Sequence, residues 1–292
     1  MLSLENLKKG TPWFIKIPAK IILSRLPIGW HRWQHLNVFR AGNMDAPAEA
    51  FAIFRKHFEA TGLTGLSGCT VLELGPGNSA ITALFAKSFG AVRTWLIDSE
   101  QLASQNTALF QQTTQMLSKL GLPAPEIDPS RSVGEVLERL SGTYLTNGLE
   151  SLKSVPDESV DFLFSNAVLE HVRLGEFAGT IQEMRRVLKP AGVASHQIDF
   201  RDHLQDGLNN LRFSERVWES TFMVRSGFYT NRIPWPAMRT MFEEGGFCVE
   251  LRSSRRWPRG LPTLQKSMSP PFRNLAEEDL MTMDAHVVLR WQ

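Results

Sequence analysis

The sequence predicts an α/β fold built on a doubly wound, mostly parallel sheet. From about residue 48 onward, apolar runs of strand length alternate with segments whose apolar residues recur at helical spacing. The run 159–167 is almost continuously apolar, which is typical of a strand buried on both faces. With 292 residues, 42% of them hydrophobic, the chain is long enough to enclose such a sheet.

The expected elements follow one another along the chain. A helix over 48–61 begins behind Pro47, with Asp45 as its predicted cap. The remaining helices are predicted over 79–89, 101–120, 133–140, 176–188 and 236–244, and the strands over 70–74, 92–98, 142–147, 159–167, 192–199, 247–251 and 285–291. The stretch 201–235 interrupts the alternation, and we expect it to fold over the sheet edge as a lid.

Composition and charge narrow the class of protein. Lys and Arg number 32 against 30 Asp and Glu, a balance that does not favour a nucleic-acid partner. The two cysteines, Cys69 and Cys248, have no metal-ligand or disulfide spacing, so we expect buried thiols in a reducing compartment. No apolar run is long enough to span a bilayer and no signal peptide is apparent, which predicts a cytoplasmic protein.

The N-terminal part differs in composition from the rest. We expect residues 1–62 to form a helical, basic and aromatic segment, and residues 63–292 to form the main domain. Between residues 11 and 40 there are five tryptophans or phenylalanines and several lysines and arginines, but no acidic residue. Two interpretations remain open: a helical cap on the main domain, or a segment that lies on an anionic membrane surface.

A glycine-rich turn, "VLELGPGNSA" over 71–80, follows the first strand of the predicted sheet. Gly75 and Gly77 let the backbone turn sharply and approach a ligand closely. Asp98 ends the next strand about 20 residues later, where it is placed to accept hydrogen bonds from ribose hydroxyls. The spacing also fits a relaxed dinucleotide fingerprint, so a nicotinamide or flavin oxidoreductase is an alternative at this point.

Four segments, taken in order, resemble the successive motifs of the Rossmann-like, class I S-adenosylmethionine-dependent methyltransferases. They are "VLELGPGNS", "WLID", "VPDESVDFLFSNAVLEHV" and "EMRRVLKPAGV", and the resemblance covers roughly residues 69–199. It implies S-adenosylmethionine as the cofactor and a seven-stranded sheet whose last strand is antiparallel. It further implies a cofactor site made of Glu73, Gly75, Gly77, Asp98, Asn147 and Asn166.

Within that implied site, each residue has an expected position. The resemblance places Glu73 and the two glycines at the methionine end of the cofactor, and Asp98 at the ribose. Asn147 stands where many family members have an aspartate for the adenine, and its amide carbonyl can accept a hydrogen bond from the adenine amino group. Asn166 is expected beside the transferring methyl group.

Methyl transfer to oxygen or nitrogen needs a group that takes a proton from the acceptor. The candidates are His171 in "LEHV", and His196 and Asp199 at the end of a strand. We favour His196 as general base or substrate ligand, with Asp199 orienting it. Together with His203, these two residues could alternatively form a divalent metal site, a reading that we rank below the base.

The predicted lid combines aromatic and arginine side chains that suit a sugar ring or an anionic group. The alternative is that the aromatics form the core of the lid and the arginines are solvated. The residues concerned are Trp218, Phe222, Phe228, Tyr229 and Trp235, with Arg212, Arg216, Arg225 and Arg232.

The N-terminal "WFIKIPAKIILSRLP" and the later "HQIDFRDH" give the chain a second, narrower resemblance, to bacterial methyltransferases of surface-polysaccharide and O-antigen assembly. This implies O-methylation of a nucleotide-linked or lipid-linked sugar or another small molecule, with peripheral contact at the inner membrane surface in the lipid-linked case. The competing hypotheses are a nicotinamide oxidoreductase and a non-catalytic, methyltransferase-like partner subunit.

Overall fold

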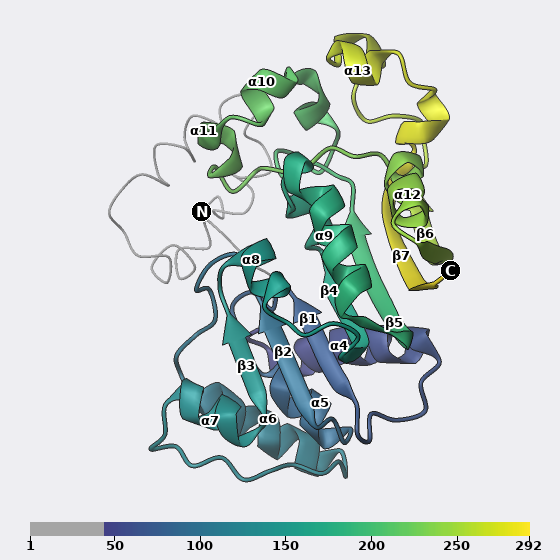
Figure 1. Ribbon diagram of the computed structural model, residues 1–292. Helices are drawn as coiled ribbons and strands as arrows, with labels where there is room; N and C mark the ends of the chain where they lie inside the picture. The colour runs from purple at the N-terminus through teal and green to yellow at the C-terminus, as the bar shows by residue number, and fades with distance from the viewer. Residues whose placement is uncertain (1–43) are drawn as a thin grey trace, which may run out of the picture.

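The computed structural model describes residues 44–292 and contains a seven-stranded sheet between two layers of helices (Figure 1). The strands are β1 (Thr70–Leu74), β2 (Arg93–Ile97), β3 (Gly142–Leu145), β4 (Val160–Asn166), β5 (Leu188–Asp199), β6 (Phe247–Arg256) and β7 (Thr282–Trp291). Their order in the sheet is β3-β2-β1-β4-β5-β7-β6. Only β7 runs antiparallel to its neighbours β5 and β6 in this described sheet, which confirms the predicted fold class.

Two hydrophobic cores lie on opposite faces of the sheet. Alternate side chains of a strand point to opposite faces, so Phe162 and Phe164 of β4 join one core and Leu163 joins the other. The helices of the first face are α4 (Pro47–Thr61), α5 (Thr82–Ser88), α6 (Ala108–Lys119) and α7 (Val133–Arg139). Those of the second face are α8 (Gly148–Lys153), α9 (Leu174–Val187) and α12 (Trp235–Glu244).

Helix α4 packs directly on the sheet. Phe54 is fully buried, and its ring centroid lies 5.9 Å from that of Phe164 and 5.8 Å from that of Phe85. The predicted cap Asp45 is wrong, because Ala46 occupies the N-cap and the helix starts from Pro47 without a side-chain cap. The division of the chain near residue 62 stays a prediction, and the basic segment 11–40 lies outside the described residues.

Helix and strand boundaries differ from the predictions where local side chains or bulges intervene. Helix α6 begins at Ala108, seven residues later than 101, because the Asn106 side chain accepts a hydrogen bond from the Ala108 N–H in a preceding turn. Strand β5 begins at Leu188 and runs through Pro190. The register with β4 shifts at this point, and a proline without an N–H is tolerated in such an irregularity.

Two long excursions lie at the carboxyl ends of the parallel strands (Figure 1). The first is the predicted lid, with η2 (Asn209–Arg212), α10 (Glu215–Trp218) and α11 (Thr221–Val224). The second, over 257–281, was not predicted and contains η3 (Gln265–Ser267), α13 (Pro270–Arg273) and η4 (Glu277–Leu280). They share a small core to which Leu208 and Leu211 contribute from the first excursion, and Met268 and Leu280 from the second.

The predicted burial of the cysteines is wrong. Cys69 is half-buried and Cys248 is exposed, because Cys248 lies on β6, the edge strand of the sheet, most of whose side chains are exposed. Both thiols are free. Among residues 44–292, none of the helices has the length and apolar character that crossing a membrane requires.

Candidate active site

A cavity of about 700 Å³ opens at the carboxyl ends of β1 and β2, the edge at which open α/β sheets bind ligands. Its volume is in the range of small-molecule and cofactor sites. The wall is built from the ends of β1 and β2, the start of α8, the segment that follows β4, and the lid. The predicted lid therefore contributes directly to the cavity, through Val224, Arg225, Gly227 and Tyr229.

The glycine turn forms the floor between β1 and this cavity. Gly75 and Gly77 have φ values of 69° and 66°, the left-handed region that glycine adopts without steric cost. A Cβ atom on Gly75 would lie only 2.3 Å from a methyl carbon of Val168, whereas one on Gly77 would meet nothing within 4 Å. The turn therefore packs tightly against the segment after β4 at Gly75, and it has open space beside Gly77.

Asp98 ties the turn to the end of β2 and lines the cavity. Its carboxylate accepts hydrogen bonds from the N–H of Gly77 at 3.0 Å and of Ser99 at 2.8 Å. Burial raises its pKa, and these N–H donors oppose the shift. A carboxylate has about four lone-pair sites, so it retains capacity for hydroxyl donors in the cavity. Beside it, Leu102 and Leu149 provide an apolar wall for a flat base, so this end fits the nucleoside part of S-adenosylmethionine.

Four of the six predicted cofactor residues do not line the cavity: Gly77, Glu73, Asn147 and Asn166. Glu73 lies beneath the turn with 2% of its surface exposed, and burial raises its pKa to about 8. Asn147 is an exposed residue at the N-cap of α8, while the next two residues do reach the cavity. Asn166 ends β4 with its amide beside the ring of His57, on the α4 side of the sheet.

His171 lies at the cavity in η1 (Leu169–His171), and its hydrogen bonds define its tautomer. Its Nδ1 is 2.8 Å from the carbonyl oxygen of Tyr229. A carbonyl only accepts, so Nδ1 carries the hydrogen and Nε2 of the neutral ring keeps a lone pair. Although the ring is exposed to the cavity, it lies deep in the surrounding protein. This burial, reinforced by the nearby His203, lowers its pKa to about 4.

His203 brings the lid into contact with His171. The two Nε2 atoms are 3.2 Å apart, and the rings stack with their centroids 4.9 Å apart. Since Nε2 of His171 carries no hydrogen, the hydrogen in this contact comes from His203. The predicted lid segment therefore supplies a donor to the imidazole at the cavity.

The structure places His196 and Asp199 away from this cavity. The His196 ring is fully buried, with Nδ1 2.7 Å from the Ser165 hydroxyl, and burial lowers its pKa to about 3. The alternation of side chains along β5 directs it into the core near Phe242. Asp199 binds the Arg201 guanidinium at 2.7 and 2.9 Å. We therefore assign neither residue as the proton acceptor, in place of the prediction that favoured His196.

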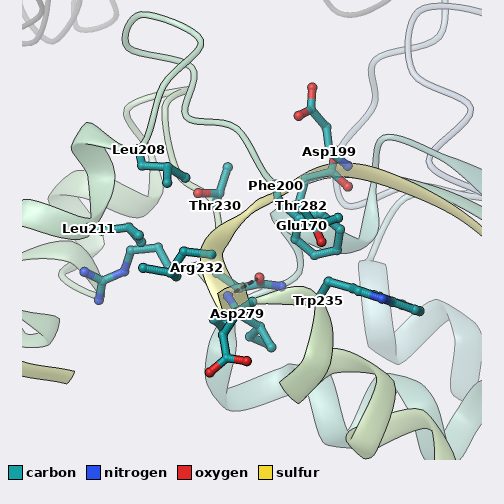
Figure 2. A pocket seen from close by; sticks show the side chains of 14 residues that line it. Glu170, Asp199, Phe200, Leu208, Leu211, Thr230, Arg232, Trp235, Asp279 and Thr282 are labelled. Atoms are coloured by element: carbon teal, nitrogen blue, oxygen red, sulfur yellow. Dashed lines mark hydrogen bonds between the residues drawn. The ribbon is translucent and has the colours of Figure 1, made fainter. Parts of the chain in front are cut away.

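A second, water-sized cavity of about 30 Å³ is lined by Glu170, Asp199 and Arg232. Figure 2 shows these residues around it. The residues predicted as an alternative metal site are accordingly not brought together, since His203 contacts His171 while His196 lies in the core. Across the described part of the chain, no three His, Cys, Asp or Glu side chains form a group that could hold a metal ion.

Most of the lid aromatics form the core of the lid, as the second interpretation of the sequence held. Trp218 and Phe228 are buried, and the Trp218 indole donates to the Thr230 carbonyl at 2.7 Å. Arg232 is also buried, with its guanidinium 5.5 Å from the Trp218 ring. Among the arginines that we singled out in the lid, Arg225 lines the large cavity.

Sequence reasoning missed Arg173, which also lines the cavity. It follows His171 by two residues in "LEHVR", so its place beside a predicted site motif was a usable signal. It also missed the Tyr229 carbonyl, a backbone group whose role no sequence pattern indicates.

Comparison with known proteins supports the cofactor assignment. Residues 72–195 match the family model of a methyltransferase domain. No curated protein matches the chain. Similar solved structures include an S-adenosylmethionine-dependent methyltransferase from Mesorhizobium loti, with 17% identity, a TM-score of 0.44, and coverage of 79% of this chain and 94% of that one.

Two further solved structures have comparable similarity. The YcgJ protein of Bacillus subtilis has 14% identity and a TM-score of 0.44, over 80% of this chain and 97% of that one. A phosphoethanolamine N-methyltransferase 2 of Haemonchus contortus, in complex with phosphomonomethylethanolamine and S-adenosylhomocysteine, has 14% identity and a TM-score of 0.44, over 81% and 52%. No substrate is inferred from proteins this distant.

The family match favours S-adenosylmethionine over the nicotinamide that the glycine spacing alone left open. The arrangement of the glycine turn and Asp98 around the cavity is consistent with that choice. Over residues 72–195 the chain is thus similar to methyltransferase domains, and S-adenosylmethionine is the cofactor that this similarity implies.

Proposed function

We propose that this protein transfers a methyl group to a hydroxyl oxygen of a sugar or another small molecule, with His171 as the proton acceptor. The observation that carries the proposal is the hydrogen bond from His171 Nδ1–H to the Tyr229 carbonyl, which puts the Nε2 lone pair at the cavity. In the structure His203 donates to this lone pair, so the acceptor hydroxyl takes the place of His203 when it binds. Its pKa, lowered to about 4, keeps this imidazole neutral at physiological pH, so the Nε2 lone pair is present before an acceptor binds.

The residues of the cavity divide the chemical work. When bound, S-adenosylmethionine supplies a methyl group as an electrophile: a C–O bond forms to the acceptor while the C–S bond breaks and leaves its electron pair on sulfur. Asp98 holds the nucleoside end, and the glycine turn lies toward the methionine end. His171 takes the hydroxyl proton at Nε2, and the Tyr229 carbonyl stabilises the resulting imidazolium by accepting from Nδ1.

We further propose that the acceptor belongs to bacterial glycan assembly in the cytoplasm, as a nucleotide-linked or lipid-linked sugar. The support for this narrower proposal is the resemblance of the "WFIKIPAKIILSRLP" and "HQIDFRDH" segments to methyltransferases of surface-polysaccharide clusters. In the lipid-linked case, the basic N-terminal segment would contact the anionic inner surface of the membrane.

The test is a methyl-transfer assay by mass spectrometry, with nucleotide sugars and polyprenyl-linked glycans as acceptors. We expect His171→Gln to lower kcat about 10²- to 10⁴-fold, the usual contribution of a general base, while S-adenosylhomocysteine binds as before. A rate within twofold of the parent would refute the role of His171. A chain that binds S-adenosylhomocysteine and methylates no acceptor would favour the non-catalytic partner subunit instead.

A further inference from the structure

We infer that the acceptor end of the large cavity binds an oxyanion, a phosphate or a carboxylate, through Arg173 and Arg225. The inference rests on the proposed function, because it places the acceptor in the same cavity. Arg173 is the N-cap residue of α9, in the main domain, and Arg225 is the C-cap residue of α11, in the lid. Both residues line the cavity, and they come from separate elements.

No carboxylate of the described residues neutralises the charges of these two arginines. In residues 44–292, neither guanidinium lies within ion-pairing distance of a carboxylate, whereas Arg186, Arg201 and Arg255 each bind an aspartate or glutamate. Two cations that share a cavity without a counter-ion repel each other, and a bound anion removes that cost. Guanidinium groups also match the geometry of phosphate and carboxylate oxygens.

The surrounding groups add to the positive potential at this end. Helix α9 directs its N-terminus toward the cavity, where the backbone dipoles favour negative charge. The nearby lid carboxylate, Glu219, does not line the cavity, and the Tyr229 hydroxyl donates to its two oxygens at 3.0 and 3.1 Å. The same hydroxyl accepts from the Leu174 N–H at 3.0 Å and so joins the lid to the start of α9.

The acidic side chains of the cavity lie mostly at the other end, near β2. Asp98 and Glu100 follow β2, at the end that fits the ribose hydroxyls. Glu176 lines the cavity from the first turn of α9, three residues beyond Arg173, and no ion pair joins the two. Among the residues that line the cavity at this end, two arginines stand against this one carboxylate, so the lining carries a net positive charge. The acceptor class that fits is a sugar phosphate, a nucleotide sugar or a sugar acid.

The experiment uses the full chain saturated with S-adenosylhomocysteine and measures binding by isothermal titration calorimetry. The probes are inorganic phosphate, glucose 1-phosphate, glucuronate and uncharged glucose. We expect at least one anionic probe to bind about tenfold or more tightly than glucose, since a charge-assisted hydrogen bond is worth that much. A preference between glucose 1-phosphate and glucuronate identifies the phosphate or the carboxylate as the natural group.

The variants Arg173→Gln and Arg225→Gln should each weaken that binding about tenfold. Arg216→Gln is the matched control, because Arg216 is an exposed lid arginine that does not line the cavity, and it should leave binding unchanged. Anionic probes that bind no better than glucose, or an equal loss in the control, would overturn the inference while leaving the methyltransferase proposal intact. Failure of S-adenosylhomocysteine itself to bind would overturn both.

Discussion

The glycine turn offers a prediction in which two neighbouring positions serve as each other's control. Replacing either Gly75 or Gly77 with alanine puts a Cβ on a residue in the left-handed region, at a cost of roughly 1–2 kcal/mol. At Gly77 this is the whole expected effect, because the new methyl group would meet nothing within 4 Å.

At Gly75 a steric term is added. The new Cβ would lie 2.3 and 2.9 Å from the two methyl carbons of Val168, closer than real Cβ contacts allow, and overpacking of this kind costs typically about 1–3 kcal/mol. We therefore expect Gly75→Ala to lower the free energy of unfolding by about 2–5 kcal/mol in total. Since Val168 lines the cavity, this variant should also bind S-adenosylhomocysteine less tightly.

The assay is urea unfolding of both variants, with calorimetric titration of S-adenosylhomocysteine in parallel. Val168→Ala removes the two methyl carbons closest to the new Cβ. Gly75→Ala should therefore destabilise a Val168→Ala chain less than it destabilises the parent chain. Equal destabilisation by the two glycine variants, or an equal effect of Gly75→Ala in both chains, would refute the assigned contact between the turn and the segment after β4.

Other predictions follow from burial and hydrogen bonding. Asp98→Asn should weaken S-adenosylhomocysteine binding at least tenfold by calorimetry, since the carboxylate that meets the Gly77 N–H and the ribose loses its charge; unchanged affinity would remove Asp98 from the site. Phe54→Ala should cost about 3–5 kcal/mol in chemical unfolding, against less than about 0.5 for exposed Arg55→Ala, and equal losses would contradict the packing of α4. In the folded protein His196 is neutral, because its pKa is lowered to about 3. As the pH falls below 6.5, this histidine binds a proton in the unfolded state but not in the folded state, so the free energy of unfolding decreases. At pH 5 this loss is about 2 kcal/mol, and His196→Gln should reduce the measured pH dependence by that amount; an unaltered dependence would contradict it.

Sequence reasoning succeeded where the information is local. The strand from Thr70, the glycine turn and the acid at the end of β2 could be placed because apolar runs, glycines and strand ends are all read from consecutive residues. It failed for the start of α6, where one asparagine side chain bonds the backbone in a turn that competes with the helix. It also missed the excursion over 257–281, whose core is completed by residues from the lid.

In the candidate site, too, the sequence could not show features that depend on contacts between distant residues. His171 follows a buried strand and His196 lies near the end of one, but only the alternation of β5 within the folded sheet decides that His196 enters the core. A one-residue difference in register moves a side chain to the other face, and a strand end is where such registers are hardest to read. The choice between the two histidines therefore needed the three-dimensional pairing of β4 with β5.

The two halves of the cavity are built in different ways, and this bears on how the enzyme would work. The cofactor half comes from consecutive elements around one turn, whereas the acceptor half joins His171 to Tyr229, 58 residues away in the lid. Because the Tyr229 carbonyl determines which ring nitrogen of His171 carries the hydrogen, displacement of the lid would free His171 to adopt the other tautomer. His171 therefore has its proton acceptor at Nε2 only when the lid is in place. An acceptor anion held between Arg173 and Arg225 would keep the lid there.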